Sequence, residues 1–138
     1  MRLLRIALAQ LNLTVGDLDG NFRKMQDSLR KAKELKVDVL AFPELTTTGY
    51  PPEDLLLKPQ FIEDNLKILD KFVKQVKGLV AVVGFIDKQD DIYDAAAVIY
   101  DKKIRGIITK CICRIMVYLM KTDISLPVPN KEFINEET

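Results

Sequence analysis

The sequence holds few of the side chains that enzymes commonly use for covalent or metal chemistry. None of its 138 residues is His, which excludes Ser-His-Asp and Cys-His catalysis and the usual zinc sites. The two cysteines, Cys111 and Cys113, are separated by a single residue and make no disulfide framework. Without a third or fourth ligand they are weak evidence for a metal site. We therefore interpret both as incidental thiols and predict no bound metal.

Glu44 is an acidic residue whose position suits chemistry. It follows a short apolar segment, residues 37–42, where a rigid sheet can aim a side chain into a pocket. The alternative is a solvated Glu in front of a loop. Tyr50 lies in that loop, next to Gly49 and to two prolines. It either lines a pocket, as a substrate-binding residue, or fills the core beside the prolines.

The elements that must position these residues can be predicted from the spacing of apolar side chains. Over residues 18–36 and 59–77 they recur every three or four residues, which predicts two helices. Residues 79–86 are continuously apolar, as in a central strand buried on both faces. Further strands are expected at residues 3–11, 37–42, 94–100 and 103–108. The resulting order predicts an α/β architecture with helices against a mixed sheet, and a hairpin turn at Asp101 and Lys102.

The composition limits the class of protein. With 138 residues, 48% of them apolar, the chain is long enough for one domain and too short for two. Its 21 basic and 20 acidic residues leave a formal charge of +1, which gives no reason to expect a nucleic-acid or membrane partner. The N-terminus lacks the apolar region and cleavage site of a signal peptide, so we expect a cytoplasmic protein.

Three segments of the chain resemble the start of a nitrilase-superfamily amidase domain. They are RIALAQLNLTVGDLDGN (residues 5–21), VLAFPELTTTGYPPEDLLL (39–57) and VVGFIDKQDDIYDAAAVIYDKKIRG (82–106). FPEL indicates the superfamily, and GYPPEDLLL is much more specific. Up to about residue 106 the chain is similar to the N-terminal glutaminase domain of the glutamine-dependent NAD synthetases. The resemblance implies a nitrilase-like α-β-β-α sandwich, of which this chain would hold about the first half.

The resemblance also implies a chemistry. In that family a Cys attacks the side-chain amide of glutamine, a Glu takes the thiol proton and passes it to the leaving ammonia, and a Lys stabilises the oxyanion. Glu44 matches the family's Glu, and Lys110 best matches its Lys, although an ordinary surface Lys is an equal alternative. The nucleophilic Cys lies in a downstream context that these 138 residues do not contain. The ammonia would serve a separate synthetase domain that uses ATP and Mg²⁺ to amidate deamido-NAD.

Asp94 departs from the family pattern, which usually has Asn at this position in Tyr-Asn-Ala-Ala. If Asp94 is buried, the change from Asn would add a charge that needs a partner.

After residue 106 the resemblance ends at an apolar stretch that matches nothing in the family. Plausible codons for residues 107–131, read with one T inserted after the first codon, give IYHKMYLPNYGVFDENRYFIAGTK. This is similar to the family's next segment. We therefore expect residues 1–107 to be the N-terminal half of the glutaminase domain and residues 108–138 to be an out-of-frame tail. Lys110 is the same residue in both reading frames, because codon 110 reads AAA with and without the inserted T.

Three functions are compatible with the sequence. The first is a fragment of a glutamine-hydrolysing domain, inactive by itself, whose intact parent binds glutamine and assembles as a homo-oligomer. The second is a stand-alone nitrilase-superfamily amidase acting on another small amide, against which the GYPPEDLLL segment argues. The third is a small α/β interaction module whose apolar tail forms an interface, against which the match in the shifted frame argues.

Overall fold

The computed structural model describes residues 3–111. Its strands are β1 (Ile6–Leu8), β2 (Val39–Ala41), β3 (Val80–Lys88), β4 (Ile92–Tyr100) and β5 (Lys103–Cys111). Its helices are α1 (Leu18–Glu34), α2 (Pro59–Val73) and a short 3₁₀ helix, η1 (Glu53–Leu57). Apart from η1, which the sequence analysis did not predict, the order of elements is the predicted one.

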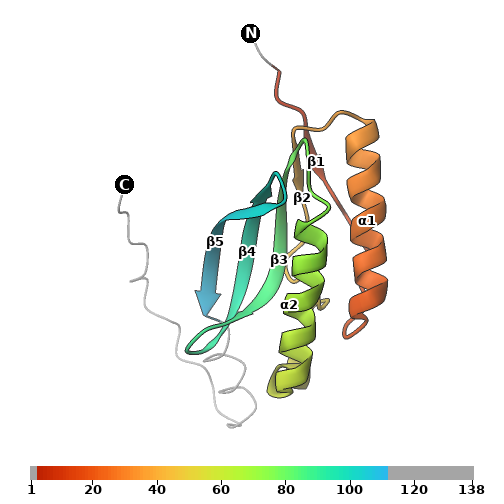
Figure 1. Cartoon of the computed structure of the whole chain (residues 1–138). Coiled ribbons are helices and arrows are strands. Elements are labelled where there is room, and N and C mark those ends of the chain that lie inside the picture. The colour runs from red at the N-terminus through yellow and green to blue at the C-terminus, as the bar shows by residue number, and fades with distance from the viewer. Residues whose placement is uncertain (1–2, 112–138) are drawn as a thin grey trace, which may run out of the picture.

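The five strands form one mixed sheet in the order β1-β2-β3-β4-β5. β1, β2 and β3 are parallel, because α1 and α2 carry the chain back between them, whereas β3, β4 and β5 are antiparallel neighbours. Figure 1 shows both helices side by side along one face of the sheet. The predicted α/β class, the mixed sheet and the central position of β3 are therefore confirmed. The described residues supply one helical layer and one sheet of the expected sandwich.

The main core fills the space between the two helices and the sheet. α1 contributes Met25 and Leu29, and α2 contributes Phe72, whose ring meets that of Phe42 edge-on with centroids 5.4 Å apart. The sheet supplies small and β-branched side chains from alternate positions, Ala81 and Val83 among them. This packing fixes where β2 and β3 end relative to each other.

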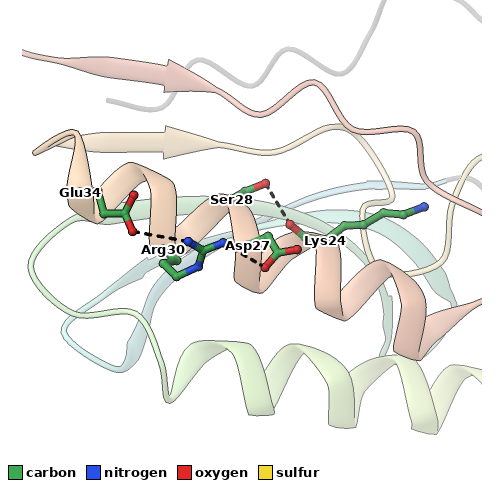
Figure 2. A network of polar contacts seen from close by, with 5 residues as sticks. All are labelled: Lys24, Asp27, Ser28, Arg30 and Glu34. Carbon is green, nitrogen blue, oxygen red and sulfur yellow. Dashed lines mark hydrogen bonds and ion pairs between the residues drawn. The ribbon is translucent and has the colours of Figure 1, made fainter.

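The outer face of α1 is polar and exposed, as its sequence period predicts. Figure 2 shows Arg30 between Asp27 and Glu34, each at 3.5 Å, with the Ser28 hydroxyl donating to the Lys24 carbonyl oxygen at 2.9 Å. Such exposed pairs contribute little to stability, roughly 0–1 kcal/mol each. We therefore interpret this network as a solvated helix face.

Several predicted boundaries were wrong. β1 and β2 have three residues each, because the ladder exists only where Ile6–Leu8 lies beside Val39–Ala41. α2 ends at Val73 instead of residue 77, because the amides of Gln75 and Val76 bond three residues back, to the carbonyls of Phe72 and Val73.

The two hairpin strands are longer than predicted. β4 begins at Ile92, and β5 continues to Cys111, so that it includes the first four residues of the segment assigned to the tail. The predicted turn at Asp101 and Lys102 is present, and both residues have positive φ, 50° and 59°. Within residues 3–111, neither α-helix is long and apolar enough to cross a membrane.

Candidate active site

Glu44 stands at the start of a tight turn that follows β2. The Phe42 amide donates to the Val82 carbonyl at 2.9 Å and the Thr47 amide to the Gly84 carbonyl at 3.4 Å, so the segment is pinned to β3 on both sides of Glu44. The four residues after Glu44, Leu45 to Thr48, are fully buried, whereas Glu44 itself is exposed. The turn is therefore held by its buried residues, and the Glu44 side chain projects from a fixed backbone.

The approach of this turn to β3 depends on Gly84. A Cβ atom at this position would lie 2.6 Å from the Leu45 amide nitrogen and 2.7 Å from the Pro43 carbonyl oxygen. Both are backbone atoms, which cannot move aside as a flexible side chain does. Gly84 thus lets the backbone that carries Glu44 lie directly on the strand.

Asp94 and Lys110 face each other across the antiparallel pair of β4 and β5. Residues directly opposite in such a pair project from the same face of the sheet. The carboxyl group of Asp94 is also hydrogen-bonded to that of Glu44. The structure therefore brings together Glu44 and Lys110, the two residues predicted to be catalytic, with Asp94 between them.

These three side chains line one open cavity of about 230 Å³. Phe42, Pro43, Val82 and Gly84 form the wall on the side of β2 and β3. Ala95, Ala96, Ile108 and Thr109 form the wall on the side of the hairpin. The cavity is a mainly apolar hollow with a few charged groups converging at one place, which is typical of a site for a small molecule.

The environment of Asp94 changes its acidity. Only 8% of this residue is exposed. Burial, the hydrogen bond that protonated Asp94 donates to Glu44 and the negative charge of Glu44 raise the pKa of Asp94 to about 7, and the positive charge of Lys110 opposes the rise. A carboxyl that titrates near neutrality beside a second carboxyl and an ammonium group can hold or transfer a proton at the site.

Tyr50 does not join this group. It is 68% exposed and is not among the residues that line the cavity. Its assignment as a substrate-binding residue stays a prediction. Cys111 is the last residue of β5, where its backbone lies opposite Tyr93, and Cys113 lies outside the described residues. Within the described residues, no group of three or more acidic or cysteine side chains gathers in the manner of a metal site.

Sequence reasoning missed two contributors to the site. In the sequence, Gly84 is part of a continuous apolar strand, and a single sequence does not show that a backbone segment packs directly on this glycine. Asp94 departs from the family pattern and needs a partner if buried, and its partners are Glu44 and Lys110. The turn at Asp101 and Lys102 alone would place Thr109 opposite Asp94. A bulge between Val98 and Ile99 shifts the register by one residue and brings Lys110 there, and the sequence carries no signal for that bulge.

Comparisons with known proteins agree with this geometry. The family model for carbon-nitrogen hydrolases matches residues 5–112. The glutamine-dependent NAD(+) synthetase of Thermotoga maritima is 46% identical over 112 residues, which are 80% of this chain and 19% of that protein. The one from Aquifex aeolicus is 40% identical over 110 residues, 78% of this chain and 19% of that protein. The chain thus spans about a fifth of the length of these relatives.

Solved structures show the same fold. The glutamine-dependent NAD+ synthetase of Acinetobacter baumannii, in complex with ADP, superposes with a TM-score of 0.72 at 35% identity, over 78% of this chain and 20% of that chain. An amidase of the nitrilase superfamily from Nesterenkonia shares the fold at 20% identity, with a TM-score of 0.67, over 78% of this chain and 42% of that one. The described residues therefore have the nitrilase fold in part. With a family match over most of its length and Glu44 and Lys110 set in one cavity of that fold, the chain belongs to the carbon-nitrogen hydrolase family.

Proposed function

We propose that this chain carries the Glu and Lys part of a glutamine-hydrolysing site that supplies ammonia for the ATP-dependent amidation of deamido-NAD. The observation that carries the proposal is the meeting of Glu44 and Lys110 at one cavity of a carbon-nitrogen hydrolase fold. The 46% identity to a glutamine-dependent NAD(+) synthetase supports glutamine as the substrate rather than another small amide.

In the proposed reaction a cysteine thiol attacks the side-chain amide of glutamine. The Glu44 carboxylate accepts the thiol proton and delivers it to the leaving ammonia, and a thioester remains on the cysteine. The Lys110 ammonium stabilises the oxyanion of the tetrahedral intermediate. Water then hydrolyses the thioester to release glutamate.

The nucleophile of this reaction is not assigned to either cysteine of the chain. Cys111 and Cys113 lie in the segment that we attribute to a shifted reading frame. We therefore propose that the 138-residue chain by itself does not hydrolyse glutamine. We assign ATP and Mg²⁺ to a separate synthetase domain, and no described residue is assigned to them.

The proposed organisation is an N-terminal half-domain over residues 1–107 and an out-of-frame tail over residues 108–138. Its support is the shifted-frame segment, which continues the family pattern and keeps Lys110 in place. A cytoplasmic location and homo-oligomeric assembly of the intact protein complete the proposal.

Two experiments test the proposed function. The first has two parts. Sequencing of the DNA around codon 107 should show a run of T bases that is one base short. Incubation of the purified chain with glutamine should release no ammonia above background. An open frame with unrelated codons would contradict the domain proposal, and ammonia release would contradict the proposed inactivity.

The second experiment uses the protein expressed from the frame-restored gene. There, Glu44→Gln should lower the rate of ammonia release by about 10²–10⁴-fold. Lys110→Met should lower it by about 10²–10³-fold. Lys103→Met is the matched control, because Lys103 begins the same strand and does not line the cavity. Equal rates for the Lys103 and Lys110 variants would rule out the assigned role of Lys110.

A further inference from the structure

Asp94 is the most buried ionisable group at the candidate site, and the proposed reaction gives it no role. On β4 it lies between two register neighbours, Ile86 of β3 and Lys110 of β5. A further neighbour is the Glu44 carboxyl, to which it is hydrogen-bonded. Among the described residues, the charged groups that face it are therefore Glu44 and Lys110.

A hydrogen bond between two carboxyl groups needs a proton. Ionised carboxylates are acceptors only, and two of them in contact repel each other. Glu44 and Asp94 line the same cavity, with Lys110 opposite Asp94 in the register, and this placement suits an acid pair that holds one proton between two groups. Lys110 adds one positive charge beside the pair, which balances the single negative charge that remains.

Burial decides which partner keeps the proton. Asp94 is only 8% exposed, whereas Glu44 is exposed. The ionised form of a buried carboxyl loses hydration, so the charge is better placed on Glu44. The pKa of Asp94, raised to about 7 by burial and by Glu44, agrees with this assignment.

We propose that Asp94 is a positioning residue for Glu44: the two side chains share one proton, and the Asp94 carboxyl donates it in a hydrogen bond that holds the Glu44 carboxylate beside Lys110. The Glu44 carboxylate is then fixed before any substrate arrives. Asn at position 94 would keep a donor without needing a proton. The inference deepens the proposed function and rests on it, because a positioning role for Asp94 requires that Glu44 be catalytic. The shared proton can be measured without catalysis.

The test is a carboxyl NMR titration of the 138-residue chain labelled with ¹³C at Asp and Glu. We expect the Asp94 signal to titrate near pH 7. In Glu44→Gln the Asp94 midpoint should fall by about one pH unit or more, since the like charge is removed. Glu53→Gln, an exposed change in η1, is the control and should leave the midpoint in place.

The pH dependence of unfolding gives a second readout. The pKa of Asp94 is raised in the folded state from 3.8 to about 7, so the folded chain binds the extra proton between these values. The stability that protonated Asp94 contributes is therefore fully present below about pH 4 and is lost as the pH rises through 7. The urea midpoint of the parent chain should fall over this window, and that of Asp94→Asn should stay nearly level.

Two results would overturn the inference. One is an Asp94 midpoint near its ordinary value in the parent chain. The other is a raised midpoint that Glu44→Gln leaves unchanged, because burial alone would then explain it. If the titration succeeds while the frame-restored protein releases no ammonia from glutamine, the proposed function fails and the acid pair stands.

Discussion

At the scale of single residues, the position of Glu44 in the candidate site depends on its contacts with two other residues. Glu44 projects from a turn whose backbone lies against Gly84, and its carboxyl meets that of Asp94. Gly84 cannot be replaced by a larger residue unless the turn that carries Glu44 moves away from the strand. The site is consequently sensitive to residues that have no chemistry of their own.

Replacing Gly84 by Ala should destabilise the chain and move Glu44. The added methyl group would lie 2.6–2.7 Å from two backbone atoms of the Glu44 turn, and overpacking of this kind costs about 1–3 kcal/mol. Urea unfolding measures the loss, and a lowered pKa of Asp94 in the carboxyl titration would report the displaced turn.

Gly106→Ala is the matched control for Gly84→Ala. Gly106 is also a strand glycine, in β5, and a Cβ atom there would meet no atom within 4 Å. Its stability should stay within about 0.5 kcal/mol of the parent chain. If both variants lose the same stability, close packing at Gly84 is not the cause.

At the scale of elements, α2 holds the Glu44 turn against the sheet through one buried amide. The Thr47 hydroxyl donates to Asn65 Oδ1 at 2.5 Å, and Asn65 Nδ2 donates to the Ile86 carbonyl oxygen at 2.6 Å. Asn21 of α1 does the same from the other helix, donating to the carbonyl oxygens of Thr14 and Thr47. Both amides lie at helix positions where the hydrophobic period alone would place an apolar side chain.

Asn65→Ala should cost roughly 2–3 kcal/mol, because it leaves the Thr47 hydroxyl and backbone groups of Ile86 buried without these partners. Thermal or urea unfolding measures the change. Gln60→Ala is the control on the same helix: its side chain bonds Asp64 at 3.0 Å in an exposed position, and its removal should cost little. A loss for Gln60→Ala as large as that for Asn65→Ala would contradict the role given to burial.

At the scale of the whole molecule, the described residues form a sheet covered by helices along one face (Figure 1). The cavity of the candidate site is lined by residues that follow β2, by β3 and by the β4–β5 hairpin. β3 lies at the centre, paired on both sides, and Ala81, Val83 and Phe85 are at most 1% exposed. β1 pairs with β2 over three residues, and its Ile6 and Leu8 side chains are 58% and 71% exposed. Stability should therefore be distributed unevenly over the sheet.

Native-state hydrogen exchange should show this distribution. The amides of β3 should exchange slowest, through global unfolding, and those of β1 should exchange faster, through local opening. The measurement is residue-resolved exchange followed by NMR. Protection of β1 equal to that of β3 would mean that the sheet opens only as a unit.

The sequence by itself determined the local part of this structure. Apolar spacing located both α-helices and all five strands, because burial of one face needs a regular period. The motif FPEL marked Glu44, and the hairpin turn was readable at Asp101 and Lys102. The ends of α2 and of β1 were missed, since they are set by which backbone partners the folded chain supplies.

Only the tertiary structure decided that the site exists as a unit. Glu44, Asp94 and Lys110 lie far apart along the chain, and they meet because β2, β3, β4 and β5 pair in one specific register. A shift of that register by one residue would turn Asp94 and Lys110 to opposite faces. The burial of Asp94 is likewise a property of the assembled sheet, and burial is what keeps a proton on a carboxyl that would otherwise be ionised.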